Sequence, residues 1–416
     1  MSVVLGIIVG LLILMLLVTG HEFGHFIAAR RNGVTVEEFG ICFPPRAVAW
    51  RKVNGKWRRL KKSEWKNPPG KGLILSLNWL PIGGFCQMKG ESDADTAKGS
   101  FGASSFWAKT KILFAGVAMN WLMAFVVLTI LAWVGMPHFL EGQFEMSGDT
   151  QTVVTAPVTI GDVVEGSPAA RAHLQKGDVI LQMRSLECEG DNCNGASNER
   201  VMINVTDDLL AFDSEHAGQT VYVTYQRGGE TGMAELTLNE EGSDYVLGAG
   251  ISGSAIYRST WSAPVVGLVT TAQITGETFK GVGQLIWNLL SGVVRQLNFF
   301  DQSARESGAE AVKAAGDSVS GPVGIIGVLF PNMMSSGLGN LMFLTAIISV
   351  SLACMNVLPI PALDGGRWLL IVIFKLRKKK LTKEVEEKIV SRAFTVLLII
   401  VAVVTVIDVA RLISNG

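Results

Sequence analysis

Residues 21–25 read HEFGH and directly continue an apolar run that begins at Val3. On a helix, His21 and His25 lie one turn apart on the same face, so both imidazoles can bind one metal ion. Glu22 lies between them and can act as general base for a metal-activated water molecule. Because the apolar run predicts a membrane helix, any metal site lies at or inside the membrane boundary, where ionisable groups are costly and usually functional. Two unrelated histidines near a membrane surface are the alternative, which a third ligand would make untenable.

The composition indicates a membrane protein with a sizeable soluble part. Of the 416 residues, 49% are hydrophobic and 17% are charged, whereas ordinary soluble domains carry about 25% charged residues. The formal net charge is +0, but residues 30–111 hold 16 Lys and Arg against 6 Asp and Glu, and residues 137–335 hold 10 against 24. A second basic block covers residues 375–392. An acidic block between two basic blocks is typical of segments on opposite sides of a membrane, and it argues against nucleic-acid binding.

Four apolar segments predict transmembrane helices, at residues 1–30, 105–135, 336–366 and 393–413. Basic residues gather after the first segment, before the second, and in residues 367–392, where we expect a cytoplasmic interfacial helix and a basic loop. The positive-inside rule places these ends in the cytoplasm. Both chain termini are then extracytoplasmic.

Residues 31–104 are expected to be a cytoplasmic segment that contains a membrane-associated β-hairpin. Residues 73–88 read LILSLNWLPIGGFCQM, in which apolar and smaller residues partly alternate and Pro81 interrupts the run. The segment is too short and too broken for a spanning helix. We therefore expect two strands joined by a turn, either dipping into the membrane or lying against the first helix. An ordinary surface hairpin is the alternative.

The acidic block predicts a folded module outside the membrane. Residues 137–258 contain several short strand patterns and one short helix after Ser167, which indicates an extracytoplasmic β-rich domain. Residues 259–335 are expected to form amphipathic helices and a linker on the outer membrane face, because a further crossing would place the basic loop outside. Cys188 and Cys193 could close a small loop in the β-rich domain, and whether they form a disulfide stays open.

A third metal ligand must reach the same depth and the same side of the membrane as the two histidines. Asp364 meets this condition, because it lies at the cytoplasmic end of the third predicted span, in the segment NVLPIPALDGG, where two prolines break the helix. Two histidines and one carboxylate leave an open fourth position, which is the catalytic pattern for zinc. Asn356 is the best nearby donor for stabilising an oxyanion. The alternative for Asp364 is a turn residue ahead of two glycines.

These motifs resemble those of the site-2 proteases, a family of intramembrane zinc metalloproteases. The resemblance rests on HEFGH in the first span, LPIGGF after it, FAGVAMN in the second span, SGPVGI before the third and NVLPIPALDGG after it. These motifs keep their order over nearly the whole chain. The segment VVEGSPAARAHLQKGDVILQM resembles a bacterial PDZ domain, and the likeness is closest to the RseP-type branch of the family.

The resemblance implies a polytopic α-helical membrane protein with four transmembrane helices, a membrane-associated β-hairpin and an inserted extracytoplasmic PDZ-like β-rich domain. It implies Zn2+ bound by His21, His25 and Asp364, with Glu22 as the catalytic general base. Asn356 would hold the substrate or stabilise the transition state.

The resemblance also implies a substrate and a place in the cell. The LPIGGF part of the hairpin, with Gly83, Gly84 and Phe85, would hold an unwound substrate by strand addition. The substrates would be single-pass membrane proteins similar to anti-sigma factors, shortened beforehand by an upstream protease. The location would be the bacterial cytoplasmic (inner) membrane, with the active site towards the cytoplasm. One PDZ module is evident, a second stays open, and His173 stands where a glycine is common in PDZ domains, so peptide binding by this module also stays open.

Two other classes of function fit parts of the sequence. A non-proteolytic, PDZ-bearing membrane adaptor with a vestigial metal site would be expected to have lost Glu22 or one of the three ligands, and all four residues are present. A metal transporter would need further ionisable residues within the spans, where they are scarce.

Overall fold

The computed structural model divides the chain into two compact units. The membrane unit comprises Met1–Thr129 and Gly267–Gly416, and the β unit comprises Ile130–Val266. The structure describes residues 3–53, 55–69, 72–140, 142–185, 200–240, 242–243, 245–296, 307–310, 313, 316 and 321–414. Cys188 and Cys193 lie outside the described residues.

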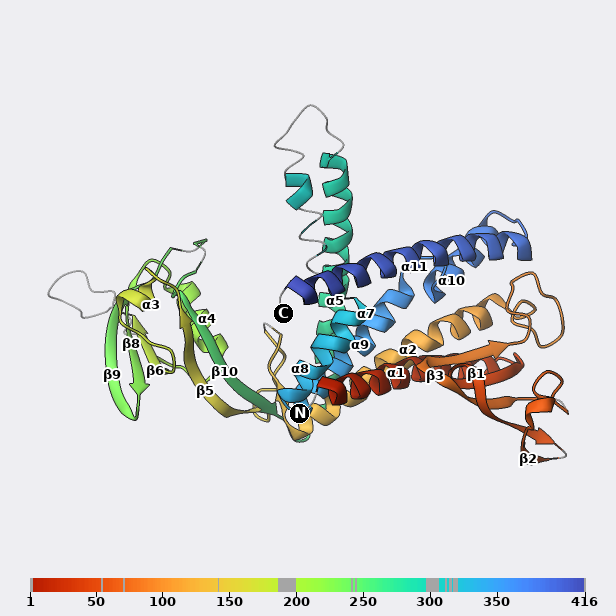
Figure 1. Cartoon of the computed structure of the whole chain (residues 1–416), viewed down its shortest axis with the longest axis horizontal. Helices are drawn as coiled ribbons and strands as arrows, with labels where there is room; N and C mark the ends of the chain where they lie inside the picture. The colour runs from red at the N-terminus through yellow and green to blue at the C-terminus, as the bar shows by residue number, and fades with distance from the viewer. Residues whose placement is uncertain are drawn as a thin grey trace. The chain divides into compact units, whose positions relative to one another are not determined.

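Four helices in the described part of the chain are long and apolar enough to cross a membrane (Figure 1). They are α1 (Val3–Arg31), α2 (Phe106–Val134), α9 (Leu338–Val357) and α11 (Lys383–Ser414). The four predicted spans are therefore confirmed as helices. Helix α11 begins ten residues before the predicted span, because the preceding charged stretch is rich in Lys and Glu, which are good helix formers. Helix α9 ends before two prolines that cannot continue it.

The β-sheet of the membrane unit differs from the predicted hairpin. It contains β1 (Val36–Val53), β2 (Lys56–Arg59) and β3 (Ile74–Met88) in the order β2-β1-β3. Residues 39–41 of β1 pair with residues 84–86 and also with residues 75–77 of β3. The two halves of residues 73–88 thus pair with β1, and a self-paired hairpin is the wrong description. The reason is that β1, which we did not predict as a strand, lies between the two halves and pairs with each of them.

One apolar cluster joins this sheet to three helices. Ala29 of α1, Phe39 and Met88 of the sheet, Leu113 of α2 and Ile371 of α10 (Asp364–Leu376) belong to it, and none is more than 9% exposed. Close packing of this kind leaves little freedom for one element to shift against another. The cluster therefore fixes the end of α1 relative to α2, β3 and α10, which are the elements that carry the candidate site.

A short helical stretch packs against the other half of α1. It consists of α7 (Pro322–Gly324), the π-helix η2 (Ile325–Leu329) and α8 (Phe330–Ser335). The carboxylate of Asp408 in α11 accepts hydrogen bonds from the backbone N–H groups of Gly321, at 3.2 Å, and Gly324, at 2.8 Å. A carboxylate at a helix N-terminus satisfies otherwise unpaired N–H groups and complements the helix dipole. This contact accounts for a carboxylate buried within a candidate span.

Residues 263–296, in the first part of the segment predicted as amphipathic helices and a linker, form one helix, α5 (Ala263–Gln296), of 34 residues. It is not among the candidate membrane spans. The indole Nε1 of Trp121 in α2 donates to the Thr275 hydroxyl at 3.2 Å, which ties α5 to α2 within the membrane unit. The helix continues because no proline follows its first turn.

Within its described residues, the β unit contains a seven-stranded sheet and the helices α3 and α4. The sequence of residues 137–258 predicts a β-rich module with one short helix, so α4 was not predicted. The strands of the sheet run in the order β4-β10-β5-β6-β8-β9, and β7 pairs with β6. Their bounds are β4 (Met136–Pro137), β5 (Gln151–Val163), β6 (Val179–Ser185), β7 (Arg200–Met202), β8 (Thr220–Arg227), β9 (Glu230–Thr237) and β10 (Ala249–Arg258).

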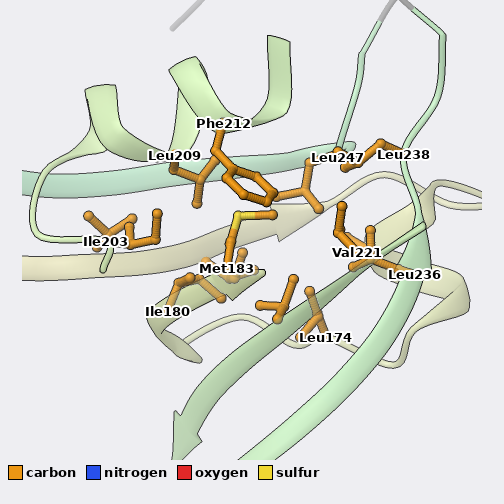
Figure 2. Packing of buried hydrophobic residues seen from close by; sticks show 14 residues of the cluster. Leu174, Ile180, Met183, Ile203, Leu209, Phe212, Val221, Leu236, Leu238 and Leu247 are labelled. Carbon is orange, nitrogen blue, oxygen red and sulfur yellow. The ribbon is translucent and has the colours of Figure 1, made fainter. Parts of the chain in front are cut away.

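The two helices of the β unit are α3 (Pro168–Arg171) and α4 (Thr206–Glu215). Helix α3 is capped by Ser167, whose side chain accepts the Ala170 N–H. His173, just beyond it, has a φ of 57°, in the left-handed region that favours glycine. Figure 2 shows Phe212 of α4 and Met183 of β6 pointing towards one another in the core between helix and sheet.

Asp213 of α4 is expected to make the stability of the β unit depend on pH. Its side chain is 5% exposed, and burial raises the pKa of its carboxyl from 3.8 to about 7. The folded state therefore holds this proton more tightly than the unfolded chain, so its stabilising effect is complete below about pH 4 and is lost as the pH rises through 7. Asp213→Asn should remove this loss and stabilise the β unit at pH 8 by on the order of 4 kcal/mol.

Urea midpoints from pulse proteolysis of the full chain at pH 5 and pH 8 check this expectation. Glu215→Gln is the matched control, because Glu215 lies on the same helix and is exposed. Its midpoints should follow those of the unchanged protein. A midpoint for Asp213→Asn that falls between pH 5 and pH 8 as much as that of the unchanged protein would exclude Asp213 as the cause.

Candidate metal centre

Helix α1 places both histidines of HEFGH on one buried face. His21 is 8% exposed and His25 is 6% exposed. Their Nε2 atoms lie 3.1 Å apart, because residues four positions apart on a helix stand one above the other. The helix thus brings two imidazole nitrogens together within its last three turns.

Asp364 reaches the same point from the other end of the chain. Its Oδ2 lies 3.1 Å from Nε2 of His21 and 3.3 Å from Nε2 of His25. Asp364 is the first residue of α10, and the two glycines after it let the chain pass closely over the end of α9. A Cβ atom on Gly365 would lie 2.1 Å from the Val357 carbonyl oxygen, so this turn requires glycine there.

The three donor atoms fit a tetrahedral metal ion. They form a triangle with sides of 3.1, 3.1 and 3.3 Å. Ligand atoms on a tetrahedral zinc ion with bonds of about 2.0–2.1 Å lie about 3.3–3.4 Å apart. Two imidazoles and one carboxylate are also a donor set that zinc accepts, with one position left open. The geometry and the donor chemistry therefore agree.

The second nitrogen of each histidine is held by α2. His25 Nδ1 donates to the Ile112 carbonyl oxygen at 2.8 Å, which leaves Nε2 with its lone pair. The side-chain amide of Asn120, which is fully buried, lies 3.3 Å from His21 Nδ1. Its Oδ1 has no hydrogen-bond partner in the described structure, and a half-turn of the amide brings it to Nδ1. His21 then donates through Nδ1, and its Nε2 also points a lone pair at the common centre.

Asp364 offers its carboxylate oxygen Oδ2 to the same centre. Metal ligands must be deprotonated, so the carboxylate form is the one that a metal site needs.

Gly116 of α2 makes room for both imidazoles. A Cβ atom at this position would lie 2.6 Å from Nε2 of His21 and 2.6 Å from Nε2 of His25. No real Cβ contact is that short, so any larger residue has to displace the rings. Two residues of the FAGVAMN motif thus support the centre. Gly116 leaves space for the histidines, and Asn120 holds His21.

Gly116→Ala is therefore expected to weaken zinc binding by about tenfold or more, which is the range for changes that misorient metal-binding histidines. Zinc titration of the purified full chain checks this expectation. Gly281→Ala is the matched control, because Gly281 is also helical and a Cβ there would meet nothing within 4 Å. Equal zinc affinity in the two variants would contradict the close approach of α2 to the histidines.

Glu22 faces a cavity of about 370 Å³ that His25 and Asp364 also line. Its carboxylate lies with the ligand atoms of His21 and His25 in a group whose members are within 4.8 Å of one another. Cys86 of β3 lines the cavity beside Glu22. The lining residues are Glu22, His25, Phe85, Cys86, Gln87, Met88, Glu91, Leu113, Asp364 and Arg367. One wall of the cavity is therefore the end of β3.

The residues predicted to bind substrate lie in different places. Gly83 and Gly84 lie against Val18 and Thr19 of α1, one turn before the histidines, and Phe85 lines the cavity. Asn356 does not line this cavity in the described structure. Its side-chain amide donates to the Leu352 carbonyl oxygen of its own helix at 3.0 Å.

Several residues near the centre were not predicted from the sequence. We assigned no role in the centre to Ile112, Cys86, Arg367 or Asn120. The signal for Asn120 was its spacing of four from Gly116, which puts both on one face of α2. No sequence pattern pointed to the Ile112 carbonyl, because a backbone acceptor can belong to any residue.

Several known proteins that resemble this chain have names that describe zinc metalloproteases. The sequence profile described as peptidase family M50 matches residues 9–61 and 65–401. A Clostridium perfringens protein provisionally named a zinc metalloprotease is 26% identical over 406 residues, covering 97% of this chain and 98% of that protein. A Campylobacter jejuni protein with the same provisional description is 26% identical over 417 residues, covering 97% and 93%. Zinc metalloprotease RasP of Shouchella clausii is 26% identical over 321 residues, covering 76% of this chain and 63% of RasP.

Proposed function

Because this chain belongs to peptidase family M50, the site-2 protease family of membrane zinc metalloproteases, we propose that it hydrolyses peptide bonds within or beside the transmembrane segments of other membrane proteins. The observation that carries this proposal is the triangle of donor atoms formed by His21, His25 and Asp364. The histidines belong to a candidate membrane span, and Asp364 follows another. A substrate that reaches this centre has to approach along the membrane.

In the proposed mechanism, His21, His25 and Asp364 hold the zinc ion. When bound, zinc acts as a Lewis acid and lowers the pKa of water at the open position. Glu22 takes a proton from the attacking water and passes it to the nitrogen of the leaving amine. Its place in the cavity beside His25 and Asp364 supports this role. Ile112 and Asn120 hold the outer nitrogens of the two imidazoles, so that both Nε2 atoms stay directed at the centre.

The substrate has to be extended when it is cut, because the carbonyl groups of a helix are hydrogen-bonded and shielded. We propose that the end of β3 supplies the strand that holds it. Residues 84–88 pair with β1 along one edge, and residues 85–88 line the cavity beside Glu22. Strand addition at an open edge provides main-chain hydrogen bonds that do not depend on sequence. Gly83, Gly84 and Phe85 would be the first contacts. Asn356 would join them only after its amide leaves the Leu352 carbonyl.

We further propose a topology and a substrate class. The ends of α1, α2 and α11 that carry basic residues face the cytoplasm of a bacterium, and both termini are extracytoplasmic. The β unit would then be a PDZ-like module outside the inner membrane, restricting access to single-pass proteins that an upstream protease has shortened. Anti-sigma-factor-like proteins are the expected kind of substrate.

Cleavage in reconstituted vesicles tests the proposed function. A single-pass protein with a short extracytoplasmic part should be cut within or next to its transmembrane segment, and mass spectrometry locates the new ends. A zinc chelator should stop the reaction, and added zinc should restore it. Cuts found only in soluble loops far from the membrane would overturn the proposal.

A further inference from the structure

A second cavity, of about 560 Å³, lies in the membrane unit away from the metal centre. It is bounded by the start of α2, the end of α10 and the start of α11. Five lysines line it, namely Lys109, Lys375, Lys379, Lys380 and Lys383. Its two acidic residues are Asp93 and Glu384. The proposed proteolytic mechanism uses none of these seven side chains.

The positive charge of this lysine pocket is only partly neutralised. Lys109 is 7% exposed and forms an ion pair with Asp93. Lys383 lies 3.7 Å from Glu387 in an exposed pair, which contributes little in water. Lys375, Lys379 and Lys380 form no ion pair within the part of the chain that the structure describes. An excess of cations therefore converges on a concave site, where an anion would be attracted by several charges at once.

The pocket also adjoins apolar surface. The Nζ of Lys375 lies 3.8 Å from the centroid of the Phe106 ring. Phe106 and Phe374 line the cavity. Trp107 follows Phe106 in the sequence and is 70% exposed, and Leu376 follows Lys375 and is 77% exposed. Tryptophans of this kind gather where a membrane meets water. A ligand here would therefore meet cations on one side and hydrocarbon on the other.

The lysine pocket lies at the ends of two candidate membrane spans, where a charged headgroup region meets the apolar interior of a membrane. Helices α2 and α11 are candidate membrane spans, and both begin at the pocket. Lysine clusters at such ends attract anionic lipids, and basic pockets between membrane helices bind their headgroups. We propose that the lysine pocket binds the phosphate-bearing headgroup of an anionic membrane lipid, whose acyl chains lie along the apolar surface beside Trp107 and Leu376. We choose a lipid over free phosphate because the cations and the exposed apolar side chains are adjacent.

Native mass spectrometry of the full-length protein in detergent tests this proposal with phosphatidylglycerol, phosphatidylcholine and inorganic phosphate as probes. The pocket variant changes Lys375, Lys379, Lys380 and Lys383 to Gln. The control variant changes the same number of exposed lysines on or beside β1 and β2 to Gln, at Lys52, Lys56, Lys62 and Lys66. Phosphatidylglycerol should bind the unchanged protein and the control alike, and bind the pocket variant at least about tenfold more weakly. Binding of phosphatidylcholine should not differ among the three.

Two outcomes would overturn the proposal. One is equal phosphatidylglycerol binding by the pocket variant and the control. The other is displacement of phosphatidylglycerol by inorganic phosphate at the concentration of the lipid, which would make the site one for free phosphate. A photoactivatable phosphatidylglycerol tests the unchanged protein independently of any variant. It should label residues 106–109 and 375–383, and labelling confined to other segments would exclude the pocket.

Discussion

Replacing Glu22 by Gln is expected to slow cleavage of a membrane-anchored substrate by about 10²–10⁴-fold while zinc stays bound, because that is the usual contribution of a general base. Gln keeps the size of the side chain but cannot take a proton from water. The three residues proposed to hold zinc are unchanged, so zinc content measured by mass spectrometry should equal that of the unchanged protein. The rate should be measured in vesicles at saturating substrate, so that it reports the chemical step.

Glu37→Gln is the matched control for this variant. Glu37 is an exposed carboxylate on β1, close to the centre in sequence but not part of its cavity. The Glu37→Gln protein should cleave the substrate at the normal rate. A Glu22→Gln protein that cleaves within a few-fold of the normal rate would exclude Glu22 as the base, and the zinc site would then need another proton acceptor.

Replacing Asp364 by Ala should remove bound zinc and cleavage together. Only the carboxylate of Asp364 reaches both Nε2 atoms from outside α1 among the described residues, at 3.1 and 3.3 Å. Changes that only misorient a ligand weaken metal binding by about 10–100-fold, so loss of a ligand should exceed that range. Zinc content after dialysis against a weak chelator checks this expectation. Asp162→Ala, at an exposed aspartate of the β unit, should keep its zinc.

Retention of one zinc ion per chain in the Asp364→Ala protein would show that another group completes the site. Glu22 and Cys86 are the nearest candidates, since both line the same cavity. Such a result would leave the histidine pair intact and would change only the third ligand.

The candidate site could be predicted to a large extent because its chemistry is written in short motifs. His21 and His25 are four residues apart, and a helix was the only element expected there. Asp364 could be proposed because the second and third predicted spans, which lie between His25 and Asp364, are expected to return the chain to the same side of the membrane. This step used topology and not sequence proximity, since 343 residues separate His21 from Asp364.

The parts that could not be predicted depend on pairing at a distance. Residues 73–88 look like a hairpin locally, but their partner is β1, and nothing in a single strand pattern names its partner. Asn356 has the right chemistry for an oxyanion, yet its amide bonds to the preceding turn of α9. A side chain near a helix end has such local acceptors available, and the sequence does not say which one it takes.

The zinc K-edge X-ray absorption spectrum of the purified full chain is the most direct measurement of the central claim that His21, His25 and Asp364 share one metal ion. The spectrum should show two imidazole nitrogens and carboxylate or water oxygens at about 2.0–2.2 Å from zinc, without sulfur. A sulfur ligand at about 2.3 Å, or a single imidazole, would show that these three residues do not share one zinc ion.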